Sequence, residues 1–143
     1  MSETEKRVGT SGQLLSGFVA LFGIICFGIA LTHIAFGPAA IPGSIPVNAT
    51  LDSEDRFYAS LFLGFGAALV WCSRDLGQRA GVFFALQATF FVGGLARIIS
   101  WIAVGPPIEL FIFLGALELI LPPALWLWHR SVFGPTNISG EQL

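Results

Sequence analysis

Apolar residues occur along this chain in long, almost unbroken blocks rather than at alternating positions. A helix needs about 20 apolar residues to cross the hydrocarbon core of a bilayer. Four blocks reach or approach this length. The second is short, and it can cross the bilayer only if Arg56 and Arg74 lie at its ends with their charges in the membrane–water interface. The predicted spans are 13–36, 56–74, 80–104 and 108–129.

Composition supports a membrane protein over a soluble domain with a large core. The chain is 55% hydrophobic and 11% charged, whereas soluble domains carry about 25% charged residues. Little sequence remains outside a single four-span transmembrane domain at 13–130, so we expect a flexible N-terminal segment at 1–12 and a polar tail at 131–143. With a net charge of -2 and no basic run, we expect no nucleic-acid partner.

The distribution of charge predicts the orientation. If the N-terminus is cytoplasmic, only Arg56 among the basic residues falls in an outer loop or helix start, and cytoplasmic segments carry the excess of lysine and arginine. Both termini are then cytoplasmic, and short second and third loops favour an all-α, up-down-up-down four-helix bundle. The basic residues on the inner side are Lys6, Arg7, Arg74, Arg79 and Arg130.

The loop at 38–54 is the longest connection between spans. It carries three prolines and a glycine in its first part, so we expect an extended cap rather than a helix. The acidic run 52–55 is expected to cap the second span and to form its first turn.

No spacing typical of a metal site or of a catalytic motif is present. The two cysteines and two histidines are far apart in the sequence, and no nucleophile elbow, phosphate loop or metalloprotease helix occurs. We therefore expect a protein that is not an enzyme and that holds no metal or cofactor.

The strongly polar side chains within the spans share helix faces with small residues. In the third span Gly93 and Gly94 precede Arg97 by one turn, and in the fourth Gly115 lies one turn before Glu118. Small residues mark the faces on which membrane helices meet. Both charges are therefore expected inside the bundle.

The expected depths of Arg97 and Glu118 in the membrane predict that the two side chains form an ion pair. Counting from the outer helix ends at 1.5 Å per residue, Arg97 lies about 10 Å deep and Glu118 about 15 Å deep. An unpaired charge there costs several kcal/mol, so an Arg97–Glu118 ion pair is the cheapest arrangement. His33, near the outer end of the first span, would complete a polar cluster, and Arg56 would form part of its upper rim.

Two prolines follow Glu118 in the same apolar run. Pro122 and Pro123 have no N–H to donate to the main-chain carbonyls of Glu118 and Leu119. Within a bilayer such carbonyls need another partner. The fourth span is therefore expected to carry a polar notch at this level, with a kink.

Several functions fit this polar cluster. The leading hypothesis is a non-enzymatic membrane protein that uses Arg97, Glu118, His33 and Arg56 to bind a small lipophilic or anionic ligand, a lipid, or a partner subunit, including a second copy of the chain. One alternative is a proton-linked transport component for a small solute, with Glu118 and His33 as protonatable groups. The other is an ion pair that only fixes helix packing.

Two segments also resemble a known family. DRFYASLFLGFGAAL and FVGGLARIISWIAVGPPIELFIFLGALELILPP are similar to small four-span bacterial membrane proteins catalogued as a domain of unknown function. The resemblance implies a multi-pass protein of the bacterial inner membrane and brings no activity with it. The positions that carry it are Arg56, Gly93, Gly94, Arg97, Gly105, Pro106, Glu118 and Pro122.

Overall fold

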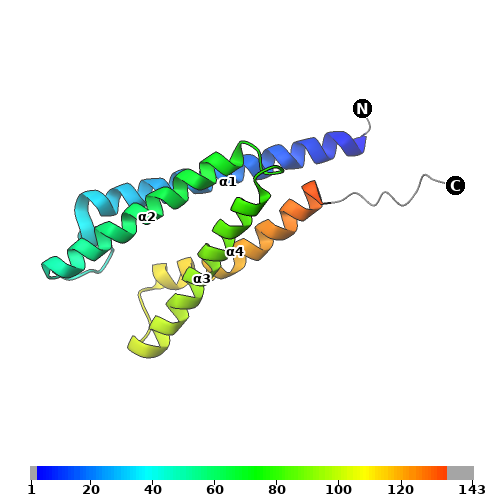
Figure 1. Ribbon diagram of the computed structural model, residues 1–143. Coiled ribbons are helices and arrows are strands. Elements are labelled where there is room, and N and C mark those ends of the chain that lie inside the picture. Colours follow the sequence, from blue (N-terminus) through cyan, green and yellow to red (C-terminus); the bar gives the residue numbers. More distant parts are fainter. Residues whose placement is uncertain (1–2, 135–143) are drawn as a thin grey trace.

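The computed structural model describes residues 3–134, with side chains from Gly9 onward. Within this range the chain is all-α, and each of its four long helices is long and apolar enough to cross a membrane. This confirms the all-α class with four candidate transmembrane helices (Figure 1). The elements are α1 (Glu3–Phe36), a short 3-10 helix η1 (Gly37–Ala40), α2 (Ala49–Ser73), α3 (Ala80–Val104) and α4 (Glu109–Phe133).

The first helix begins earlier than the sequence predicts. The segment 1–12, expected to be flexible, is helical from Glu3 onward and continues into the first span without a break. Glutamate, lysine and arginine are good helix formers, so this polar stretch extends a helix that the apolar span already nucleates. Most of the tail at 131–143 lies outside the described residues, although α4 itself extends to Phe133.

The second helix also begins before its predicted start. The side chain of Asn48 accepts a hydrogen bond from the main-chain N–H of Leu51 at 3.0 Å, which makes Asn48 the N-cap. Asp52 then lies in the first turn, near the positive end of the helix dipole. The expectation of an extended loop at 38–54 was therefore wrong at both ends: residues 38–40 belong to the 3-10 helix η1, and the capping asparagine precedes the acidic run.

Neighbouring helices pair as two antiparallel hairpins. In the first hairpin, α1 and α2, Gly23 lies against Gly66 and His33 lies against Asp55. In the second hairpin, α3 and α4, the backbone of Gly94 faces Leu119. Figure 1 shows the two hairpins meeting at the end that holds the α2–α3 turn and diverging toward the α3–α4 turn. We call these the closed end and the open end.

The hydrophobic core lies at the closed end. Trp128 of α4 donates a hydrogen bond from Nε1 to the hydroxyl of Ser11 of α1 at 3.0 Å, which joins the two hairpins there. Farther along, Phe90 of α3 packs against Phe22 and Phe65, with ring centroids 5.1 and 5.8 Å apart. The fully buried core side chains are Leu15, Val19, Leu69, Cys72, Leu76, Phe83 and Leu125.

Candidate polar site in the second hairpin

Arg97 of α3 and Glu118 of α4 form an ion pair. Nε of Arg97 donates to Oε2 of Glu118 at 2.7 Å. The glutamate side chain is 11% exposed and the arginine side chain 41% exposed. The acid is therefore enclosed between the helices, while the guanidinium reaches outward from them.

Glycines make room for this pair. A Cβ on Gly115 would lie 3.4 Å from Cδ of Arg97, and one on Gly93 would lie 3.8 Å from Oε2 of Glu118. A Cβ on Gly94 would lie 2.9 Å from the Leu119 side chain, closer than real Cβ atoms approach. The small residues thus let α3 and α4 approach at the level of the charges, as small residues do between membrane helices.

Part of the guanidinium has no partner. Apart from Nε, no nitrogen of Arg97 makes a hydrogen bond within the described residues, although the group lies over the Phe111 ring at 5.5 Å from its centroid. Arginine carries five N–H donors in a planar fork that matches carboxylate and phosphate oxygens. The terminal nitrogens of Arg97 are therefore available to an acceptor from outside the chain.

The position of Arg97 on α3 indicates where its unpaired terminal nitrogens lie. Phe83, Phe90 and Arg97 recur at seven-residue spacing, which places them on one face of α3. Phe83 belongs to the core and Phe90 packs on the first hairpin. Arg97 continues the same face toward the open end, where Figure 1 shows the hairpins apart.

His33 and Arg56 lie in the first hairpin and have acidic partners of their own. Nδ1 of His33 lies 3.1 Å from Oδ2 of Asp55. Arg56 donates from Nε to Oδ2 of Asp52 at 2.8 Å and from Nη1 to the main-chain carbonyl of Ile34. These contacts join the C-terminal end of α1 to the N-terminal end of α2.

The structure therefore does not bring the four predicted site residues into one cluster. Arg97 lies with Glu118 in the second hairpin, and His33 and Arg56 lie in the first. The physical reason is local: Asp52 is one turn from Arg56 on the same helix face and offers it a carboxylate without any contribution from α4.

The two prolines lie inside a continuous helix. Pro122 is buried, and α4 runs unbroken from Glu109 to Phe133 through Pro122 and Pro123. No side chain among the described residues donates to the main-chain carbonyl of Glu118 or of Leu119. The two prolines thus remove the N–H groups that would donate to these carbonyls in a regular α-helix, without interrupting α4.

Sequence reasoning missed a buried polar residue of α3. Gln87 of α3 is 3% exposed, and neither its Nε2 nor its Oε1 has a hydrogen-bond partner within the described part of the chain. A buried polar group without a partner is uncommon and points to an unseen water or ligand. The available signal was its seven-residue spacing to Gly94, which places it on the buried face of α3.

Within the part of the chain that the structure describes, no three histidine, cysteine or acidic side chains lie close enough together to hold a metal ion. Cys26 and Cys72, both buried, are free thiols. The polar site is thus built from one acid, Glu118, and one base, Arg97.

One family matches this chain, over residues 14–129: the domain of unknown function DUF4345. The match includes all four long helices in large part and both members of the Arg97–Glu118 pair. No curated protein and no solved structure matches the chain. The resemblance inferred from the sequence is confirmed, and the chain belongs to the DUF4345 family of small four-span proteins.

Proposed function

We propose that this protein is a non-enzymatic, multi-pass protein of the bacterial inner membrane that binds a small amphiphilic ligand through Arg97. The observation that carries the proposal is the state of that guanidinium. Its Nε is held by the enclosed Glu118, while its terminal nitrogens have no acceptor within the described residues.

Physical chemistry favours an anionic head group as the occupant. Hydrogen-bond donors left without acceptors in an apolar environment cost several kcal/mol each on hydrocarbon transfer scales. A carboxylate or phosphate oxygen satisfies the guanidinium fork through charge-assisted bonds. The surrounding surface of α3 is apolar, with Ile98 and Ile99 exposed, which suits a hydrocarbon tail beside the head group.

The ligand test compares two charge-pair variants of the purified protein. Arg97→Leu/Glu118→Leu removes the proposed site, and His33→Leu/Asp55→Leu removes a similar pair from the first hairpin. We expect mass spectrometry of protein purified in mild detergent to find an amphiphile bound to the wild type and to the second variant, and its loss from the first by tenfold or more.

Retention of the same bound molecules by both variants would contradict the binding proposal. The Arg97–Glu118 pair would then serve only to pack α3 on α4. Loss of a co-purifying protein or of a second copy of the chain, rather than of a small molecule, would indicate that the site docks a partner subunit.

The proposal includes an up-down-up-down arrangement with both termini in the cytoplasm. It is supported by the basic residues Arg74, Arg79 and Arg130 at the closed end, where Arg79 lies over the Trp71 ring at 4.0 Å and Arg130 over the Trp126 ring at 4.8 Å. Arginine and tryptophan together are typical of the cytoplasmic membrane interface.

Alkaline phosphatase fusions test this orientation, because the enzyme is active only outside the cytoplasm. We expect a fusion after Gly134 to be inactive and a fusion after Ser44, in the α1–α2 connection, to be active. The reversed pattern would place the closed end outside, and the proposed site would then lie in the inner half of the membrane.

The proton-linked transport alternative receives less support. It requires Glu118 and His33 to act on one path, whereas His33 pairs with Asp55 of its own hairpin. We therefore carry forward the binding proposal alone.

A further inference from the structure

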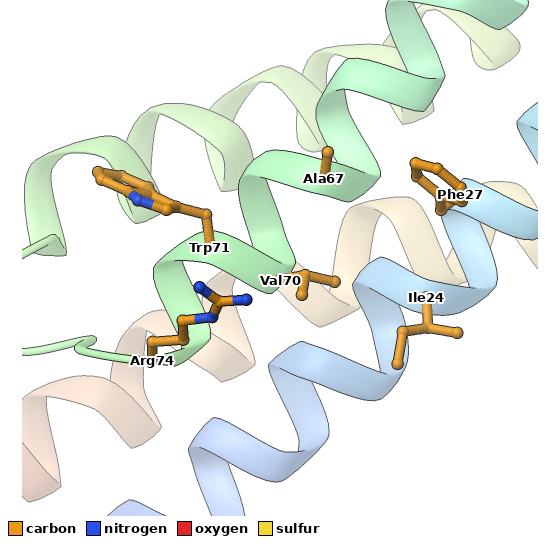
Figure 2. A pocket seen from close by; sticks show the side chains of 6 residues that line it. All are labelled: Ile24, Phe27, Ala67, Val70, Trp71 and Arg74. Carbon is orange, nitrogen blue, oxygen red and sulfur yellow. The ribbon is translucent and has the colours of Figure 1, made fainter.

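A pocket lies between α1 and α2, away from the polar site. It has a volume of about 340 Å³ and is lined by Ile24, Phe27, Ala67, Val70, Trp71 and Arg74. Figure 2 shows these side chains along the two helices, with Arg74 at one end and Phe27 toward the other. Apart from the guanidinium and the indole N–H, the lining side chains are hydrocarbon.

The lining residues lie on a face of the first hairpin other than the one that packs on Phe90 of α3. Ala67, Val70, Trp71 and Arg74 recur at spacings of three and four along α2, as residues on one side of a helix do. Phe65, which packs on Phe90 of α3, belongs to a different side. The pocket therefore opens toward the surrounding lipid.

The charged end of the pocket has no partner in the chain. The guanidinium of Arg74 makes neither a hydrogen bond nor an ion pair within residues 9–134, whereas the neighbouring Arg79 donates to the carbonyl of Trp71 and stacks on its ring. Asp75, the adjacent acid, already accepts a hydrogen bond from the main-chain N–H of Gln78 at 3.1 Å.

The geometry points to a binding site for an anionic phospholipid, with its phosphate on Arg74 and one acyl chain along Ala67, Val70, Ile24 and Phe27. α2 ends at Ser73, so Arg74 and Trp71 lie at the membrane–water interface, where head groups are found. From Arg74 to Ala67 the helix rises about 10 Å into the apolar layer. A phosphate there meets an unpaired cation, and the chain below it meets only hydrocarbon.

This site is independent of the polar site at Arg97. It lies on the other hairpin, and it would remain if Arg97 proved to be purely structural. It also differs from general lipid contact, because it combines one unpaired arginine with a bounded apolar pocket.

Quenching of Trp71 by brominated lipids tests the inference. The chain has four tryptophans, so a background with Trp101, Trp126 and Trp128 changed to phenylalanine leaves Trp71 as the reporter. In vesicles we expect brominated phosphatidylglycerol to quench Trp71 with a relative association constant about fivefold above that of brominated phosphatidylcholine, as about 1 kcal/mol per basic residue predicts.

Arg74→Gln should bring this preference close to one, and Ala67→Phe should reduce quenching by both lipids by filling the chain pocket. Arg130→Gln is the matched control, since Arg130 is a basic residue at the same end of the protein that does not line the pocket. Its preference should equal that of the background.

Equal quenching by the two lipids, or an unchanged preference in Arg74→Gln, overturns the inference. Removal of the preference by excess inorganic phosphate would also overturn it, because the site would then bind phosphate without a lipid chain. Since Trp128 donates to Ser11, the background can fail to fold. Native mass spectrometry of the full chain and of Arg74→Gln with the same two lipids then decides, with the same fivefold expectation.

Discussion

Arg97→Leu is expected to lower the stability of the folded protein more than either Glu118→Leu or the two substitutions together. Removing the arginine leaves the carboxylate of Glu118 enclosed between α3 and α4 with no cation beside it. A charge left in the apolar layer costs about 3 kcal/mol on insertion scales. Glu118→Leu should cost less, because the half-exposed arginine can extend its long side chain toward the nearby membrane interface.

The double variant should recover most of the stability, since replacing both members of an enclosed pair by hydrophobic residues is often neutral or better. The measurement is the thermal midpoint in detergent micelles, followed by the yield of monodisperse protein. An equal loss in Arg97→Leu and in the double variant would contradict this order. The carboxylate would then have found another donor, and the pair would not govern packing of the second hairpin.

The pairing of Arg97 with Glu118 could be predicted from the sequence because it depends on the depth of each residue in the membrane and on the direction of each helix. Two charged residues on consecutive antiparallel spans, at similar distances from the same membrane face, have few other partners. The small residues on their faces added the information that both helices meet there. Arg97 and Glu118 are in contact in the structure.

The separation of the two hairpins could not be predicted in this way. Apolar residues surround all four helices, so the hydrophobic pattern does not say which face of α3 meets α1 or α2. His33 and Arg97 both lie in the outer leaflet of the sequence-based topology, but they belong to different hairpins. The aromatic contacts of Phe90 and the core at the closed end define how far the hairpins stay together.

Gln87 shows a related limit. Within a long apolar span a single neutral amide is unremarkable, and its burial depends on the packing of neighbouring helices. Its polar atoms lack partners within the described residues, and the core residue Phe83 lies one turn away on the same helix. The seven-residue spacing to Gly94 indicates which face of α3 carries Gln87, but not which residues surround its side chain.

Gly66→Ala is expected to be among the most damaging substitutions of one methyl group in the first hairpin. A Cβ on Gly66 would lie 2.7 Å from the carbonyl oxygen of Gly23 and 2.7 Å from the main-chain nitrogen of Phe27. These atoms belong to the backbone of α1 and cannot move aside as a flexible side chain would. The helices must separate, so we expect a loss of about 3 kcal/mol, the upper end for overpacking.

Gly64→Ala is the matched control, because nothing lies within 4 Å of a Cβ at that position on the same helix. It should be neutral or stabilise slightly, since alanine is the better helix former by up to about 1 kcal/mol. Thermal midpoints of the two variants in the same detergent make the comparison. Similar midpoints for Gly66→Ala and Gly64→Ala would mean that α1 and α2 do not cross at backbone contact.

Gly23→Ala extends the test to the other side of the same contact. Its Cβ would lie 2.8 Å from the carbonyl oxygen of Gly66, so both substitutions push the same two helices apart. Once the first methyl group has separated them, the second meets less resistance. The double variant should therefore lose clearly less stability than the sum of the single losses, by 0.5 kcal/mol or more, as coupled neighbours do. Additive losses would place the two glycines in separate contacts.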